Sequence, residues 1–255
     1  MEDLITSMEY FFPDAISGLP LLCLLAASFV GSLITASLGV GGGAFLIIVM
    51  AEFITPVVLI PLHGLVQFAS NGSRAWLTRI HIDRSLVVAF FIGAFLAALI
   101  GLTGIRALPE DAISWAVAIF ILYSCWGKLP SAGFSESKTG RVLGGFLTTL
   151  ATLFAGATGP LVASWLRTPN IDRFYYTANF SSCMTLQHAL KVIVFSFAGF
   201  SFYEWAGVLV LMVLAGLVGT KLGLKLLGRL PEETFKTAFK WLLTLLAVRL
   251  IYKLV

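Results

Sequence analysis

Charged residues are scarce in this chain of 255 residues, where they make up 12% of the sequence against 58% for hydrophobic residues. Soluble domains contain about 25% charged residues. The mean hydropathy is +0.95. These values exclude an ordinary soluble fold, because so few polar groups could not cover its surface. The sequence therefore predicts an all-α, polytopic membrane protein whose residues 1–255 form a single transmembrane domain.

Cysteine and histidine are also rare, with three of each. The cysteines stand singly within apolar stretches, so neither a CxxC metal site nor a disulfide framework is expected. The histidines are scattered along the sequence, and a GxxxxGK[ST] nucleotide-binding motif is absent. We therefore expect no metal, no cofactor and no catalytic residue. The net charge of +4 comes largely from short segments between apolar stretches, which is typical of membrane topology and argues against nucleic-acid binding.

Apolar stretches follow one another along the whole chain. They cover about 19–38, 43–52, 57–77, 85–103, 112–127, 142–155, 161–168, 174–199, 206–228 and 234–252. Many approach the ~20 residues that a helix needs to cross a bilayer. Two junctions are unusual, because residues 37–43 contain a glycine cluster and residues 155–160 contain a Gly-Pro pair. Neither continues a regular helix cheaply, so we expect a helix to break at each within the membrane.

The two halves of the sequence resemble each other. A shift of 117 residues places Gly39 on Gly156 and Gly42 on Gly159, and a shift of 122 residues places the Leu-Pro-Glu of 108–110 on that of 230–232. We therefore predict two four-helix repeats, at about 18–127 and 141–255, whose first helix is broken at the glycine motif.

Basic residues indicate how the repeats are oriented. If each broken region turns back and exits where it entered, then the basic segments 74–84, 128–141 and 225–236, with Arg167 and Arg173, all face the cytoplasm. Arg106, Lys253 and the acidic N-terminus then face outward. This arrangement makes the repeats inverted, as in many secondary transporters. The alternative remains open that both regions cross fully, since 19–38 alone is long enough to span.

Buried polar residues indicate a binding site. Lys191 lies deep within an apolar stretch, and the shift of 117 places it on Arg74 and His188 on Asn71. Both repeats thus carry a cation three residues beyond a hydrogen-bonding side chain, on one helix face. Half-helices that begin after a glycine turn also direct free backbone N–H groups into the break, which attracts anions. The predicted substrate-binding residues are Gly41, Gly42, Gly43, Asn71, Arg74, Thr158, Gly159, His188 and Lys191.

Each of these residues has a simpler explanation. The glycines can serve close helix packing, Lys191 can extend toward the outer interface, His188 can be a hydrogen-bonded packing residue, and Arg74 can be a topology anchor at the inner face.

The ordered motifs resemble the sulfite exporter TauE/SafE family, a family of small-anion permeases. They are 39–43, then 156–161, which has Thr158 and Pro160 in place of a full triple glycine, and 228–232 before the last helix. The resemblance covers nearly the whole chain. It implies transport of sulfite or of an organosulfonate such as sulfoacetate across the bacterial cytoplasmic (inner) membrane.

The leading hypothesis is therefore a secondary transporter, not an enzyme, that moves a small anion by alternating access around a midplane site. The alternative is an integral membrane enzyme acting on a small or lipidic substrate, which would need clustered histidines and carboxylates. The expected partners are the anion and the lipid bilayer, with both termini outside. The sequence leaves the oligomeric state open.

Overall fold

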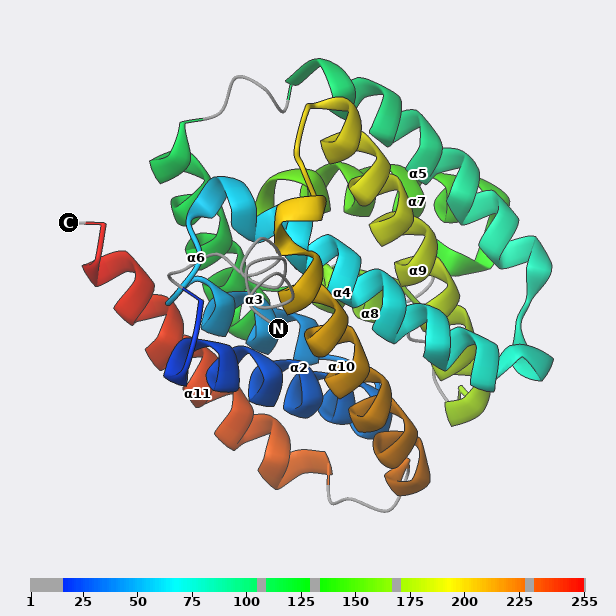
Figure 1. The fold of residues 1–255 in the computed structure, drawn as a ribbon. Helices are drawn as coiled ribbons and strands as arrows, with labels where there is room; N and C mark the ends of the chain where they lie inside the picture. Colours follow the sequence, from blue (N-terminus) through cyan, green and yellow to red (C-terminus); the bar gives the residue numbers. More distant parts are fainter. Residues whose placement is uncertain (1–15, 105–108, 129–133, 167–170, 228–231, 255) are drawn as a thin grey trace, which may run out of the picture.

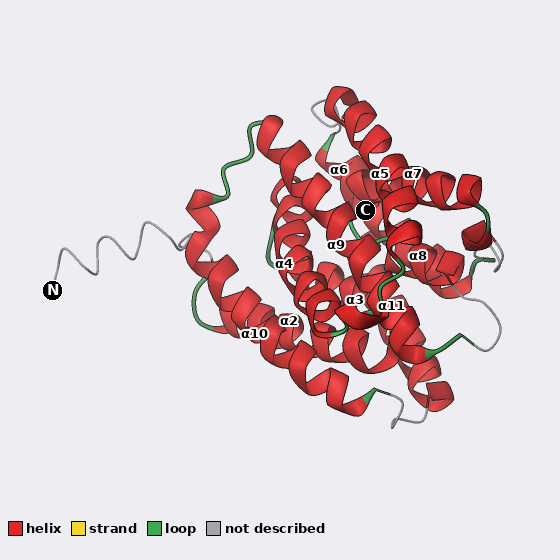
Figure 2. Cartoon of the chain, turned by 90° about the vertical axis from the view of Figure 1, so that its right-hand side faces the viewer, coloured by secondary structure: helices red, strands yellow, loops and turns green. Residues whose placement is uncertain are grey.

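The computed structural model describes residues 16–104, 109–128, 134–166, 171–227 and 232–254, without the side chains of 134, 232–236 and 238. Within these ranges it contains ten α-helices and no strand (Figures 1 and 2). The helices are α2 (Leu19–Leu38), α3 (Gly42–Met50), α4 (Pro56–Leu77), α5 (Arg84–Gly104), α6 (Glu110–Trp126), α7 (Lys138–Ala155), α8 (Gly159–Leu166), α9 (Arg173–Phe197), α10 (Ala206–Leu226) and α11 (Glu232–Tyr252). The all-α prediction is confirmed, and each apolar stretch of the sequence coincides with one helix. The acidic N-terminus, Arg106, Arg167 and residues 228–231 lie outside the described residues.

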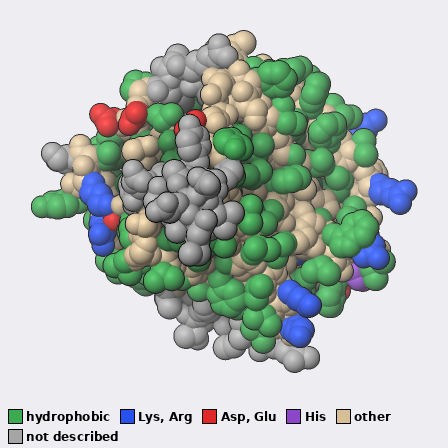
Figure 3. All heavy atoms as spheres, in the orientation of Figure 1, with side chains coloured by type: hydrophobic (Ala, Val, Ile, Leu, Met, Phe, Trp, Pro, Cys, Tyr) green, Lys and Arg blue, Asp and Glu red, His purple; other side chains and the backbone are tan. Residues whose placement is uncertain are grey.

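Three helical segments of the described chain are long and apolar enough to cross a membrane: Leu19–Leu38, Arg84–Gly104 and Tyr203–Leu226. Figure 3 shows that hydrophobic side chains dominate one face of the molecule, while Lys and Arg gather toward its left and right edges. Large apolar side chains such as Ile92, Leu99, Val210 and Leu245 are 45–66% exposed, which a lipid environment explains. The protein is a multi-pass membrane protein.

The two short helices fold back against the helices that precede them. The α-carbon of Gly42 lies so close to α2 that a Cβ atom there would stand 1.6 Å from the carbonyl oxygen of Gly31. A Cβ atom on Gly31 would in turn lie 3.6 Å from the Cβ of Leu46, so α3 runs back along α2. In the second half, the Trp165 indole donates a hydrogen bond of 3.2 Å to the Gly140 carbonyl. The end of α8 therefore lies beside the start of α7.

Glycines with left-handed backbone make both reversals possible. Gly39 and Gly41 have φ values of 91° and 109°, and Gly156 has a φ of 77°. A residue with a side chain is strained in this region, whereas glycine is not. The Gly39 N–H caps α2 by donating to the Thr35 carbonyl, and the Gly156 N–H caps α7 by donating to the Thr152 carbonyl. The chain therefore changes direction before α3 and before α8, while the last turns of α2 and α7 keep these hydrogen bonds.

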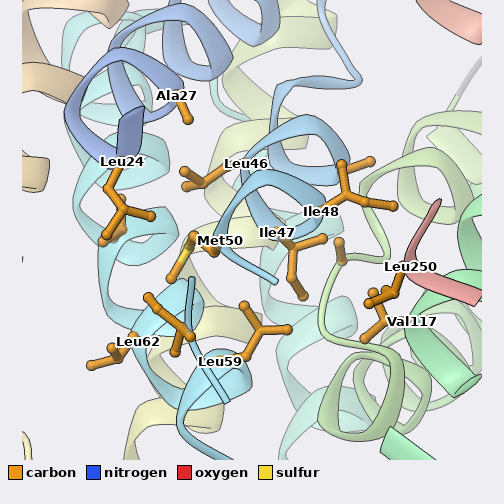
Figure 4. Packing of buried hydrophobic residues seen from close by; sticks show 14 of the residues in the cluster. Leu24, Ala27, Leu46, Ile47, Ile48, Met50, Leu59, Leu62, Val117 and Leu250 are labelled. Carbon is orange, nitrogen blue, oxygen red and sulfur yellow. The ribbon is translucent and has the colours of Figure 1, made fainter. Parts of the chain in front are cut away.

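Long helices of one half pack on helices of the other half. A Cβ atom on Gly93 of α5 would stand 1.8 Å from the Val142 carbonyl oxygen of α7, and one on Gly219 of α10 would stand 2.2 Å from the Phe29 carbonyl oxygen of α2. Such close backbone approach is the usual way in which membrane helices associate. The core between them includes α3, where Leu46, Ile47 and Met50 are buried against α4 and neighbouring helices (Figure 4).

Asp83, in the loop before α5, connects the start of α5 with the first turns of α9. The Asp83 carboxylate accepts from the Leu86 N–H, which caps α5, and from the Tyr175 hydroxyl of α9 at 3.1 Å. The Asp83 N–H donates to the Asn179 side chain. Partial burial alone would raise the pKa of Asp83, but the hydrogen bonds that its carboxylate accepts from Leu86 and Tyr175, with the charge of Arg141, hold this pKa below its usual value.

The variant Asp83→Ala is expected to lower stability by about 1 kcal/mol, the usual cost of losing such a cap. Because the pKa is lower in the folded state, this contribution is fully present at neutral pH and is lost only as pH falls through the folded pKa, below 3.8. Thermal unfolding in detergent at pH 7 measures the effect. Asp83→Asn is the matched control, since asparagine caps equally well. An unchanged melting temperature for Asp83→Ala would show that the loop contributes nothing.

Candidate functional site

A small cavity lies between α4 and α9, where both short helices begin. Its lining comes from α2, α4, α9 and the starts of α3 and α8 with the residues just before them: Thr35, Gly41, Gly43, Ala44, His63, Gln67, Asn71, Ala157, Gly159, Pro160, Phe180, Met184 and His188. Its volume of about 10 Å³ is enough for one water molecule. A ligand larger than a water molecule would need the surrounding helices to separate.

Helical spacing explains why these side chains share one space. His63, Gln67 and Asn71 are four residues apart on α4, and Phe180, Met184 and His188 are four residues apart on α9, so each set forms a stripe on one face. The two helices run antiparallel, because Gly64 of α4 lies against Lys191 of α9 while Gly72 lies against Thr185. The two stripes therefore face each other across the cavity.

Lys191 lies at one end of this cavity and is fully buried. Its ammonium group donates to the Gly156 carbonyl at 2.7 Å and lies 3.5 Å from Nδ1 of His63. It therefore does not extend to an interface. His63 also contacts the break of the first half, because its Nε2 lies 2.9 Å from the Gly43 carbonyl oxygen. A lysine of α9 and a histidine of α4 thus connect both glycine junctions.

His188 faces His63 with its ring edge on, at a centroid distance of 5.7 Å. Both ring nitrogens of His188 are buried and lack a hydrogen-bond partner in the described structure, as do Nε2 of Gln187 and Oδ1 of Asn71. The Asn71 amide nitrogen is occupied by two hydrogen bonds to Gln67. Buried polar atoms are nearly always paired in proteins. The unpaired atoms of Asn71 and His188 belong to residues that line the cavity, which is consistent with a polar ligand there.

Arg74 lies beyond the opposite end of the cavity. It is fully buried, and its only hydrogen bond in the described structure is a long one of 3.5 Å to the Ser70 hydroxyl. Its Nε and Nη1 atoms have no partner. Arg74 follows Gly64, the residue next to Lys191, by ten positions on α4, which is about 15 Å along the helix axis.

The structure brings five of the nine predicted site residues to the cavity, namely Gly41, Gly43, Asn71, Gly159 and His188. The other four do not line it. Gly42 packs against Gly31, and Thr158 is buried with its hydroxyl 3.4 Å from Gln187 Oε1. Lys191 and Arg74 lie at the two ends.

Sequence reasoning missed His63, Gln67, Phe180 and Met184, although a signal for them existed. The same shift of 117 residues that relates Asn71 to His188 also relates His63 to Phe180 and Gln67 to Met184. The histidines are not all scattered, because His63 and His188 meet in space. Among the described residues, no three His, Cys, Asp or Glu side chains form a group that could hold a metal ion.

Comparison with known proteins assigns the chain to a family. The family model described as "Sulfite exporter TauE/SafE" matches residues 23–250. No curated protein and no solved structure gave a significant match.

Proposed function

Because the chain belongs to the sulfite exporter TauE/SafE family of membrane anion transporters, we propose that it is a secondary transporter of sulfite or a small organosulfonate such as sulfoacetate. One observation carries this proposal. Lys191 and Arg74 are fully buried, yet the buried side chains of the described residues include no Asp or Glu. A buried cation without a counter-charge is costly. An anionic substrate supplies the missing charge.

The chemistry of the site supports the same substrate class. The groups left free near the site include donors in the Gln187 amide, the His188 ring and the Arg74 guanidinium, and one acceptor, Oδ1 of Asn71. The ammonium group of Lys191 also keeps donor capacity beyond its bond to Gly156. Most of these donate hydrogen bonds, as the oxygens of a sulfite or sulfonate group require. A cation carrier would instead need buried carboxylates. The site residues are thus those expected to bind an oxyanion.

Helix boundaries support two related four-helix units within one domain. Adding 117 to the first residues of α3 and α4 gives 159 and 173, where α8 and α9 begin. Adding 122 to the first residues of α5 and α6 gives 206 and 232, where α10 and α11 begin. We propose that the halves are inverted repeats that rock about the cavity, which gives alternating access.

We also propose the re-entrant topology in the bacterial inner membrane. Lys253 at the end of α11 pairs with Glu52 after α3, and Arg249 lies 3.1 Å from the same carboxylate, so these two ends share one face. The basic residues Arg79, Arg84 and Arg141 lie near the helix ends opposite to those at Glu52. The positive-inside rule then assigns Glu52 and both chain termini to the outer side.

Cysteine labelling tests this topology. Single cysteines at Ile80, Ser137 and Arg173 are expected to react with an impermeant reagent from the cytoplasmic side, and a cysteine at Thr55 from the outer side. The reason is that α8 returns to the start of α7, as the Trp165–Gly140 hydrogen bond shows. If the cysteines at Ser137 and Arg173 react from opposite sides, then α7 and α8 together cross the membrane and the re-entrant arrangement is wrong.

Uptake into proteoliposomes tests the function. Radiolabelled sulfite and sulfoacetate are offered to the reconstituted protein under an imposed potential, positive inside. A potential of 100 mV favours anion entry by about 2.3 kcal/mol per charge. The proposal predicts saturable uptake that rises with the potential and is absent from protein-free liposomes. Uptake no faster than in protein-free liposomes, across both anions and a wider panel of sulfonates, would refute it.

A further inference from the structure

Arg74 has an environment of its own, separate from the cavity. The Ser70 hydroxyl that it contacts lies 2.9 Å from the Ser32 hydroxyl of α2 and 3.2 Å from the Thr220 hydroxyl of α10. All three hydroxyl residues are buried, and none lines the cavity. A guanidinium group and three hydroxyls from three helices therefore meet in one place.

Close packing holds these hydroxyls in position. A Cβ atom on Gly216 of α10 would stand 3.0 Å from the Ser32 hydroxyl oxygen, and the Ser28 hydroxyl donates to the Met212 carbonyl at 2.6 Å. The α2–α10 contact thus fixes two of the three helices around Arg74. A site built on packed helices positions its groups more accurately than one built on loops.

A purely structural role does not explain Arg74. A buried structural arginine normally forms a bidentate pair with a carboxylate or donates to several carbonyl oxygens. Here Nε and Nη1 donate to nothing in the described structure, and the single bond from Nη2 is 3.5 Å long. Leaving two charged donors unpaired away from water costs several kcal/mol. The group is therefore prepared for a ligand that brings negative charge.

We infer that Arg74, with the hydroxyls of Ser32, Ser70 and Thr220, forms a second anion subsite between the cavity and the inner face. This inference rests on the proposed function. The guanidinium donors Nε and Nη1 bind two oxygens of a sulfite or sulfonate group, and the one hydroxyl proton that the Ser32–Ser70–Thr220 bonds leave free donates to the third.

Distance makes this subsite separate from the one at Lys191. The Arg74 guanidinium contacts Ser70, and the Lys191 side chain contacts Gly64, six positions earlier on α4. The two cations therefore lie about 9 Å apart along the helix axis. This spacing exceeds the width of a sulfite ion, so each cation binds an anion of its own. Asn71, which lines the cavity, precedes Arg74 by three residues, about 4.5 Å along the same helix. An anion that leaves the cavity toward the inner face thus reaches Arg74 within one helical turn.

Transport measured separately from each face of the membrane tests the subsite. Right-side-out and inside-out membrane vesicles from cells that express the full chain give the half-saturating sulfite concentration at each face. We expect Arg74→Gln to raise this concentration at least tenfold at the face that carries the Arg79 loop and less than twofold at the Glu52 face. Arg84→Gln, which removes an exposed arginine near the same face, is the matched control and is expected to change neither value.

A double variant of the hydroxyl residues keeps the test decisive. Ser70→Ala with Thr220→Val retains the arginine and is expected to raise half-saturation at the Arg79 face about threefold or more, even if Arg74→Gln fails to fold. Equal increases at both faces, or unchanged values in the hydroxyl variant, would overturn the subsite while leaving sulfite transport by the intact chain in place. Absence of sulfite transport by the intact chain would refute the proposed function and the subsite with it.

Discussion

Lys191→Met is expected to raise the half-saturating sulfite concentration by about 10- to 100-fold without destabilising the protein. The variant removes the cation at the end of the cavity, and a hydrogen bond to a charged group contributes about 1.5–3 kcal/mol. Each 1.4 kcal/mol corresponds to a tenfold change in affinity. Proteoliposome uptake measures the loss.

The Lys191→Met variant should lose affinity for sulfite without losing thermal stability. Methionine follows the stem of lysine, and the Gly156 carbonyl keeps a hydrogen bond from the Thr152 hydroxyl at 3.1 Å. Removing an unpaired buried charge relieves a desolvation cost. The melting temperature in detergent should therefore stay the same or rise. Lys225→Gln, which neutralises an exposed lysine at the end of α10, is the control and should leave transport unchanged.

A fall in melting temperature for Lys191→Met, together with unchanged half-saturation for sulfite, would assign Lys191 to structure and remove it from the site.

Gly42→Ala is expected to destabilise the protein by at least about 3 kcal/mol, the upper part of the range for overpacked sites. The new methyl group would stand 1.6 Å from the Gly31 carbonyl oxygen and 2.5 Å from the Thr35 hydroxyl oxygen. Backbone atoms cannot move aside as a flexible side chain can, so α3 must separate from α2. The yield of monodisperse protein and its melting temperature measure this effect.

Gly159→Ala is the matched control, because the shift of 117 relates it to Gly42. A methyl group there would meet its nearest atom, on the Phe180 ring, at 3.7 Å, an ordinary contact. We expect a normal melting temperature for this variant. Equal melting temperatures for the two variants would show that the α2–α3 contact is not as close as described.

The helices could be predicted from the sequence because apolar stretches bounded by glycine, proline and charge leave little choice within a bilayer. The partner of Lys191 could not be predicted. His63 lies 128 residues away in the sequence, and only the antiparallel packing of α4 on α9 brings the two together. Periodicity identifies which face of a helix is polar, but it does not identify the helix that this face meets.

The surroundings of Arg74 could not be predicted from the sequence either. The repeat alignment relates Arg74 to Lys191, and the structure buries both. Its surroundings include Ser32 of α2 and Thr220 of α10, whose hydroxyls bond to the Ser70 hydroxyl that Arg74 contacts. Serine and threonine are common in membrane helices, where they often bond to their own backbone. Nothing in their spacing distinguishes these hydroxyls from the others.

The central claim is that the transported anion binds in the cavity between α4 and α9. Protection of a cysteine at Ala44, which lines that cavity, tests it most directly, with Cys23, Cys125 and Cys183 replaced by alanine. We predict that sulfoacetate slows reaction of this cysteine with a methanethiosulfonate reagent at least fivefold, with half-protection at the half-saturating concentration for transport. A cysteine at the exposed Ser137 should not be protected. Unchanged labelling of the Ala44 cysteine at saturating sulfoacetate would contradict the account.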